Sequence, residues 1–495
     1  MAARRSFRVA LMMAAIVVAG QTSAIGHVPD ESRAADVKCR AKVKVPIKSV
    51  EWFEAVCLDD LTTNSNERTD RGSTTGWGSQ TSGALHSKYS KPPKKAVPGL
   101  QLDGYFADSC SDYQTEPTTF IPPCDNGMRH QGQFVLRVPN NWNGKLMVAG
   151  TPGIRDQFAS DFVFSDYAMR RGWAYIAGDK GNMSTDFYHE GADERGGDEA
   201  PGSPHVPAKA IRQWHKQFRQ ITVLAQRFLK ANYGRAPRRT YAVGISNGGY
   251  QARVALERNP RLYDGGVDWE GTLFLPEGPH ILTYLPTYLK YYEDWKQGNQ
   301  EAHEKMLEAG LEPGSEPLWD YHWTIYWGLT QKIYRAALDP EFTTDPPDQP
   351  PVMVVPPNDP DADYDYSSRP DVVKERVGTI SNTGDIGKPL ITLHGTYDSL
   401  LPISLDSDVY ARMVRDEGHA KIFRYYRVVG ANHVDPQADD KPAMRALLPC
   451  VRKSLNLLDR WIVKKSKPPR SHTIPYPEDG TSENLANRCN LKAGL

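Results

Sequence analysis

The residues with the clearest chemical meaning form the run Gly244-Ile245-Ser246-Asn247-Gly248, which fits the pattern G-x-S-x-G. The run stands between a predicted strand, residues 240–243, and a predicted helix, residues 248–258. So sharp a turn needs small residues two before and two after the serine, and it leaves the hydroxyl exposed. The amino end of the helix favours a nearby anion. We interpret Ser246 as a nucleophile; the alternative is an incidental serine in a glycine-rich turn.

A serine nucleophile needs a general base and a group that orients the base. Asp398 follows a predicted strand at residues 389–393, and His433 follows another at residues 422–428. Both therefore lie after the carboxyl ends of strands, at the sheet edge that carries Ser246. We predict a triad of Ser246, Asp398 and His433. The alternatives are a solvated loop acid for Asp398 and a loop histidine with satisfied hydrogen bonds for His433.

Other polar residues nearby are weaker candidates. Asp406 and Asp408 are of the same residue type as Asp398 but fall inside a predicted helix, so they are weaker candidates for the triad acid. His394 is expected to make a structural hydrogen bond, and His419 is expected at the surface.

The charge that develops on the substrate oxygen needs two backbone N–H donors. Asn247, directly after the serine, is predicted to supply one. The second is expected from the glycine-containing turn after residues 145–149, where Pro152 has no N–H and leaves Gly153 or Ile154. The alternative is an ordinary glycine turn.

The elements that must position these residues alternate between strand and helix. Strands are predicted at residues 134–138, 145–149 and 173–177, and the clearest helix at residues 208–232. The repeat of strand and helix predicts an α/β fold with a mostly parallel, twisted sheet and helices on both faces.

An aromatic-rich stretch interrupts this repeat and sets the domain boundaries. We expect an inserted lid there, which could line a substrate pocket or form a small core of its own. The expected parts are a leader at residues 1–24, a partly irregular extension at 25–130, the first core part at 131–282, the insertion at 283–382 and the second core part with its tail at 383–495.

The insertion contains an acidic run with Asp359, Asp361, Asp363 and Asp365. The run lacks the glycine and the final glutamate of an EF-hand calcium loop. We expect a solvated acidic loop, and calcium binding there stays open. The proposed chemistry needs no metal and no organic cofactor.

Composition excludes several classes of protein. The chain has 495 residues, of which 39% are hydrophobic, too many for a disordered chain. Lys+Arg and Asp+Glu number 60 each, which argues against a nucleic-acid-binding protein. Beyond the leader, no apolar run of about 18 residues predicts a membrane span. The oligomeric state stays open.

The leader and the cysteines indicate an exported protein, secreted or periplasmic. Arg4, Arg5 and Arg8 precede a short apolar run, with cleavage expected after Ala24. General and twin-arginine export both fit, and an uncleaved anchor helix is the alternative. Six cysteines allow 15 disulfide pairings. The local choice is Cys39–Cys57, Cys110–Cys124 and Cys450–Cys489.

At these residues the chain resembles the α/β-hydrolases, and in particular the exported 3-hydroxybutyrate oligomer hydrolases. The resemblance rests on the segments Ser246-Asn247-Gly248-Gly249, Asp179-Lys180-Gly181, His394-Gly395, Asp398-Ser399-Leu400-Leu401-Pro402 and Asn432-His433, and covers roughly residues 130–460. It implies Ser246 as nucleophile, Asp398 as acid and His433 as base, acting on short hydroxyalkanoate oligoesters.

The chain also resembles the tannase and feruloyl esterase family in its export signal, its aromatic lid and its GxSxGG turn. That family joins a cysteine before the serine to one after the histidine, where this sequence has Ile245 and Val434. The resemblance implies a feruloyl or galloyl esterase as an alternative. The sequence leaves two more functions open, a serine peptidase of the same fold and a non-catalytic binding protein.

Overall fold

The computed structural model describes residues 39, 42–69, 94–106, 121–122, 124, 130–153, 155–181, 208–342, 359–441, 444–476 and 489–492. All described residues belong to one compact unit within residues 38–495. The expected leader, Cys110 and Ile154 lie outside the described residues. Among the described helices, none combines the length and hydrophobicity that crossing a bilayer requires.

Ten strands of the described chain form one sheet, in the order β1-β2-β3-β5-β4-β6-β7-β8-β9-β10. Pairing is antiparallel from β1 to β3 and between β3 and β5, and parallel from β5 through to β10. The mostly parallel sheet is therefore confirmed. The strands are β1 (Val50–Leu58), β2 (Gly99–Phe106), β3 (Gln133–Pro139), β4 (Lys145–Gly150), β5 (Ala174–Gly178), β6 (Arg239–Ile245), β7 (Gly265–Trp269), β8 (Leu390–Gly395), β9 (Phe423–Val428) and β10 (His472–Ile474).

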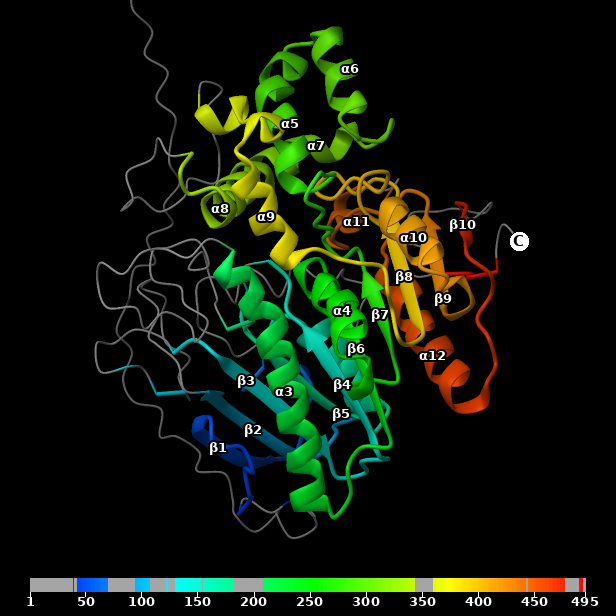
Figure 1. Cartoon of the computed structure of the whole chain (residues 1–495). Helices are drawn as coiled ribbons and strands as arrows, with labels where there is room; N and C mark the ends of the chain where they lie inside the picture. The colour runs from blue at the N-terminus through cyan, green and yellow to red at the C-terminus, as the bar shows by residue number, and fades with distance from the viewer. Residues whose placement is uncertain are drawn as a thin grey trace, which may run out of the picture. The chain divides into compact units, whose positions relative to one another are not determined.

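Helices cover both faces of this sheet (Figure 1). Apolar residues of α3, α4 and α10 share one hydrophobic cluster with the strands, and residues of α2 and α12 share another. The helices are α2 (Asp166–Arg170), α3 (Lys209–Tyr233), α4 (Asn247–Arg258), α5 (Ile281–Lys296), α6 (Gln300–Glu308), α7 (Glu316–His322), α8 (Gly328–Leu338), α9 (Asp371–Ile380), α10 (Ser407–Asp416), α11 (Gln437–Asp440) and α12 (Leu448–Lys464).

The aromatic insertion between β7 and β8 comprises α5 to α9, which lie beside the carboxyl ends of the parallel strands in Figure 1. Most of its aromatic rings are buried in one cluster, which also takes in Trp214 of α3 and Tyr250 of α4. Buried aromatic rings contribute large apolar areas to a core. Most of these residues therefore pack in a core that the insertion shares with α3 and α4, not in one of its own.

The acidic run within the insertion differs from expectation. Asp361 is buried, with its carboxylate 3.0 Å from Arg335 Nε and 3.4 Å from Lys332 Nζ. Asp359 lies 2.9 Å from the same lysine. The prediction of a solvated acidic loop was wrong at Asp361, because cations from α8 neutralise it.

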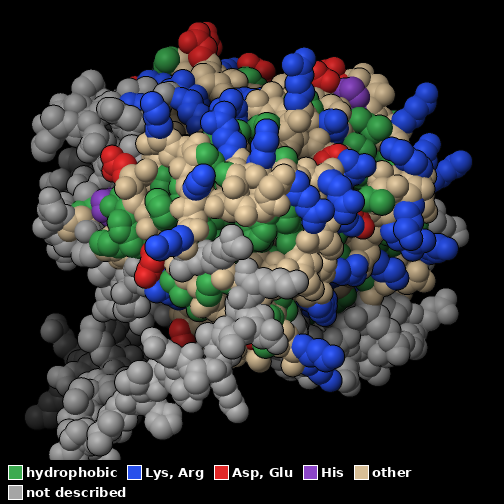
Figure 2. All heavy atoms as spheres, turned by 90° about the horizontal axis from the view of Figure 1, so that it is seen from below, with side chains coloured by type: hydrophobic (Ala, Val, Ile, Leu, Met, Phe, Trp, Pro, Cys, Tyr) green, Lys and Arg blue, Asp and Glu red, His purple; other side chains and the backbone are tan. Residues whose placement is uncertain are grey.

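The opposite end of the sheet, where the parallel strands begin, is rich in cations. Figure 2, the view from below, shows Lys and Arg side chains gathered on this face. The helices α2, α3 and α12 end near the strands' starts, and the exposed residues there include Arg170, Arg235, Arg238, Lys464 and Lys465. Because a helix carries partial negative charge at its carboxyl end, cations there stabilise the helices.

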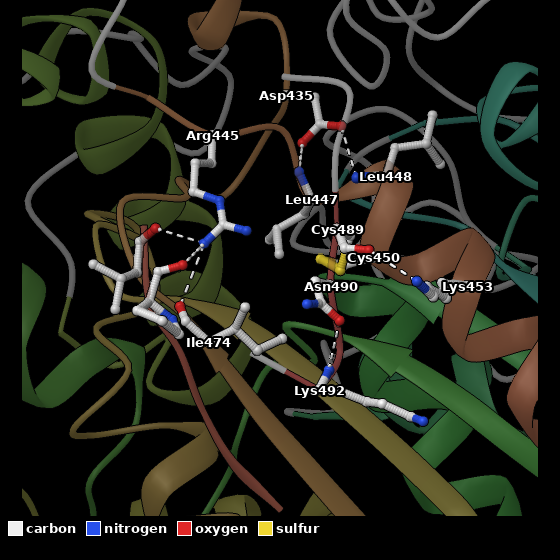
Figure 3. Close-up of a disulfide and its surroundings, with 12 residues drawn as sticks. Asp435, Arg445, Leu447, Leu448, Cys450, Lys453, Ile474, Cys489, Asn490 and Lys492 are labelled. Atoms are coloured by element: carbon white, nitrogen blue, oxygen red, sulfur yellow. Dashed lines mark hydrogen bonds between the residues drawn. A yellow bond between two sulfur atoms is a disulfide. The ribbon is translucent and has the colours of Figure 1, made fainter. Parts of the chain in front are cut away.

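Two disulfides match the local pairing expected from the sequence. Cys39 is bonded to Cys57 of β1, and Cys450 of α12 to Cys489 near the chain end (Figure 3). The third expected pair includes Cys110, which lies outside the described residues. Disulfides are typical of proteins in an oxidising compartment.

Candidate active site

The serine stands in a strained turn between β6 and α4. Ser246 has φ +56° and ψ −125°, in the sterically unfavourable half of φ space for a residue with a side chain. A Cβ atom added to Gly244 would lie 2.0 Å from the Gly248 carbonyl oxygen, and one added to Gly248 would lie 2.3 Å from that of Gly150. The small residues predicted around the serine are therefore sterically required.

Neighbouring parallel strands line up the other candidates at the same edge. The backbone N–H of Ser246 donates to the Trp269 carbonyl of β7 at 2.9 Å, and Glu270 N–H donates to the Leu393 carbonyl of β8 at 2.9 Å. Asp398 follows β8, and His433 follows β9, the next strand. Each predicted triad residue thus follows the carboxyl end of a strand in one contiguous parallel set.

The structure brings the acid and the histidine into direct contact. The Nδ1–H of His433 donates to Asp398 Oδ2 at 2.7 Å, and both residues are buried. This leaves Nε2 as the imidazole nitrogen that can accept a proton. The loop of His433 is anchored by Asp435, whose carboxylate accepts the N–H groups of Leu447 and Leu448 beside α12 (Figure 3).

Hydrogen bonds fix the orientation of the Asp398 carboxylate. Its Oδ1 accepts the N–H groups of Leu400 at 2.9 Å and Leu401 at 2.8 Å, and His394 Nε2 lies 3.2 Å from Oδ2. Burial opposes the charge of Asp398, but the two histidines outweigh it and hold its pKa below the usual range. Burial likewise opposes charge on His433, yet Asp398 raises the pKa of that imidazole.

A buried ionic network is linked to Asp398 through His394. Arg253 of α4 donates to Asp268 Oδ2 at 2.6 Å, to Asp406 Oδ1 at 3.0 Å and to Ser407 Oγ at 2.7 Å. The same Ser407 Oγ lies 2.7 Å from His394 Nδ1. The structural role expected for His394 fits this geometry, and Asp406 is the residue at the start of α10 rather than one inside it.

The turn expected to hold the oxyanion lies against the serine turn. The side-chain oxygen of Asn247 accepts Tyr334 OH at 2.6 Å and Thr272 Oγ1 at 3.0 Å, and its Nδ2 donates to the Gly153 carbonyl at 3.4 Å. These bonds use the polar atoms of the Asn247 side chain. Asn247 is also the first residue of α4, so its backbone N–H has no carbonyl partner within the helix. Gly153 has φ +49°, a conformation that glycine adopts without strain.

Glu270 is the residue that the sequence reasoning missed. It follows β7, is fully buried and has φ +49°. Its Oε1 accepts the N–H of Gly395 at 2.6 Å, and its Oε2 lies 3.4 Å from His433 Nδ1. The sequence offered one signal for Glu270, which directly follows the alternating apolar residues Val267 and Trp269 of a strand. Because no strand was expected there, the acid was not placed at the sheet edge.

The insertion contacts the site through bonds to the neighbours of the predicted triad. Tyr334 of α8 bonds Asn247, which follows Ser246. Trp327 Nε1 donates to the carbonyl of Ser399, which follows Asp398, at 2.7 Å. His322 Nε2 donates to Asn432 Oδ1, directly before His433, at 3.1 Å. These three bonds were not expected from the sequence.

Glu270, Asp398 and His433 are also the described residues whose ligand atoms could surround a metal ion, since those atoms lie within 4.8 Å of one another. The 2.7 Å separation of Nδ1 and Oδ2 is that of a charge-assisted hydrogen bond. Hydrogen bonding accounts for this cluster.

A nucleophile turn after β6, an acid after β8 and a histidine after β9 of one parallel sheet, in that chain order, define one known architecture. The chain has the α/β-hydrolase fold. Residues 122–268 match the family described as "Tannase and feruloyl esterase". Ile245 and Val434, which replace the cysteines of that family, are buried in one hydrophobic cluster.

Similar proteins include several ester hydrolases. Mono(2-hydroxyethyl) terephthalate hydrolase of Piscinibacter sakaiensis is 27% identical over 147 residues, which are 29% of this chain and 24% of that protein. This chain therefore spans about a quarter of that relative's length. Feruloyl esterase B from Aspergillus oryzae has a TM-score of 0.49 and 12% identity, covering 85% of this chain and 89% of that one. Tannin acyl hydrolase from Aspergillus niger has a TM-score of 0.47 and 12% identity, covering 86% of each chain.

Proposed function

We propose that this α/β-hydrolase is an exported serine ester hydrolase. The observation that carries the proposal is the 2.7 Å contact between His433 and Asp398, at the sheet edge where Ser246 stands in its strained turn. The match of residues 122–268 to an esterase family supports ester rather than amide hydrolysis.

In the proposed mechanism, His433 Nε2 takes the proton of Ser246 Oγ as this oxygen attacks the ester carbonyl. Asp398 holds the imidazole in the tautomer with Nδ1–H and stabilises the imidazolium. Backbone N–H groups of Asn247 and of the turn near Gly153 bind the oxyanion. The protonated His433 then gives its proton to the leaving alcohol. Water, activated in the same way, releases the acid and restores Ser246.

Two acyl classes are candidates for the substrate. The family match favours aromatic esters of the feruloyl or galloyl type. A cationic feature near the site fits short hydroxyalkanoate oligoesters, whose chain end is a free carboxylate. Arg155 lies in the turn after β4, its carbonyl accepts Lys180 Nζ at 3.2 Å, and its positive charge acts on His433. We propose the oligoesters as substrate and keep the aromatic esters as the second candidate.

Product analysis tests both levels of the proposal. The protein is incubated with hydroxybutyrate oligomers, methyl ferulate, methyl gallate and a peptidyl anilide, and the products are identified by mass spectrometry. We expect ester cleavage that Ser246→Ala reduces by about 10⁴-fold or more. A Ser246→Ala protein that retains most ester cleavage would contradict the mechanism. Covalent labelling of the wild type by a fluorophosphonate separates an enzyme from a binding protein.

A further inference from the structure

Glu270 lies where a second acid can act on the proposed base. Its side chain is fully buried, and the carboxyl faces His394 at the end of β8, Asp398 in the loop after β8 and His433 in the loop after β9. The positive φ of +49° is strained for a glutamate. Such strain persists in a structure when surrounding contacts enforce it. This backbone conformation directs the Glu270 side chain toward His433 and Asp398.

The two carboxyls differ sharply in the donors that they receive. Asp398 accepts three N–H donors, from His433 Nδ1 and the backbone of Leu400 and Leu401. His394 Nε2, which bonds the Leu401 carbonyl at 2.9 Å, also lies 3.2 Å from Oδ2. Glu270 receives the single N–H of Gly395 on Oε1. Its Oε2 is buried and has no hydrogen-bond donor in the described chain.

Two neighbouring buried carboxyls cannot both be ionised without a large cost, so such pairs retain one proton between them. The donor count places the charge on Asp398 and the proton on Glu270 Oε2. Burial and the nearby charge of Asp398 both act in this direction and raise the pKa of Glu270 well above its usual value.

We propose that Glu270 is a protonated positioning residue, which donates the hydrogen bond of its Oε2–H to the Asp398 carboxylate and so presents His433 with one negative charge instead of two. The proposal rests on the proposed function. A second full charge beside Nδ1 would stabilise the imidazolium and leave less of the free base that accepts the serine proton. A neutral acid orients Asp398 without this effect.

The first test is spectroscopic and needs no turnover. In the Ser246→Ala background, the infrared difference spectrum between this protein and its Glu270→Gln variant should show one protonated carboxyl band in neutral buffer that the substitution removes. NMR of the His433 ring should give nearly the same titration midpoint in both, because the amide replaces a neutral acid. A missing band, or a midpoint that Glu270→Gln lowers by about one unit or more, would show a charged Glu270 and overturn the proposal.

The second test is kinetic, with the native Ser246. Glu270→Gln should retain kcat and its pH profile. Glu270→Ala, which removes the hydrogen bond to a charged group, should lower kcat roughly tenfold to a hundredfold with KM little changed. An unchanged kcat in Glu270→Ala would contradict a positioning role.

Glu257→Gln is the matched control. This glutamate accepts the N–H groups of Thr383 and Gly384 and the hydroxyl of Tyr410, remote from the histidine. It should leave the His433 midpoint and the carboxyl band unchanged. Loss in Glu257→Gln of the same band that Glu270→Gln removes would assign the proton to the wrong acid and overturn the proposal. If the protein cleaves no ester at all, the proposed function fails, and the two spectroscopic measurements still decide the protonation of Glu270.

Discussion

The substitution Asp398→Asn tests how the acid controls the proton on His433. Leu400 and Leu401 donate to Oδ1 of Asp398, at 2.9 and 2.8 Å. An asparagine keeps these bonds only if its carbonyl oxygen takes the Oδ1 place. Its NH₂ group then replaces Oδ2, which lies 2.7 Å from His433 Nδ1. A donor at this position forces Nδ1 to accept, so the ring proton moves to Nε2 and the base is lost.

The expected loss follows from the wrong tautomer. Replacing a triad aspartate by asparagine lowers kcat by about 10⁴-fold, which corresponds to about 5 kcal/mol in the activation free energy. In the wild type, kcat/KM should fall as the pH drops through the raised pKa of His433. In Asp398→Asn, the midpoint of this acid limb should lie lower, because the carboxylate that raises it is gone.

The assay is hydrolysis of p-nitrophenyl acyl esters across pH, with circular dichroism to verify folding. Asp408→Asn is the matched control, since Asp408 of α10 accepts the hydroxyl of Tyr425 and should retain activity. Turnover of Asp398→Asn within about tenfold of the wild type would refute the argument. Because Asp398 has a lowered pKa, its contribution to folding stability is present above its unfolded pKa and is lost as the pH falls through the folded one.

Two further substitutions probe the surroundings of the site. Arg253→Met leaves two buried carboxylates without their cation and should reduce the free energy of unfolding in urea by about 3–5 kcal/mol. Lys290→Met breaks an exposed ion pair and should cost less than about 1 kcal/mol; equal losses would contradict the argument from burial. Tyr334→Phe removes one of two hydroxyl donors to Asn247 and should lower kcat roughly twofold to tenfold at constant KM. A change in KM alone would assign Tyr334 to substrate binding instead.

Much of the sheet edge could be predicted because its signals are local. Gly244 reflects a steric requirement within five residues of chain, where a Cβ would meet the Gly248 carbonyl, and the G-x-S-x-G pattern itself stands in one short run. Asp398 and His433 each follow a strand with a recognisable apolar run, so their edge of the sheet follows from strand direction alone. The two disulfides in the described chain join the cysteines expected from sequence separation.

The features that were missed depend on partners distant in the sequence. The strand β7 contains two glycines and the buried Asp268, a composition that argues against a strand. Arg253 of α4 and Thr392 of β8 satisfy this carboxylate, at 2.6 and 2.9 Å. Because β7 was not expected, Glu270 was not placed at the sheet edge. The burial of Asp361 was not expected, because the cations that neutralise it come from α8.

The contacts of the insertion bear on how substrate reaches the site. Tyr334, Trp327 and His322 each bond a residue adjacent to one predicted triad member. A lid that swings away as one body would break all three bonds and expose a buried aromatic cluster that also includes residues of α3 and α4. Exposing these rings to water would raise the free energy, because each large aromatic ring buries a substantial apolar area. We therefore expect the helices of the insertion to stay in place during turnover and to hold the serine turn, the acid loop and the histidine loop in register.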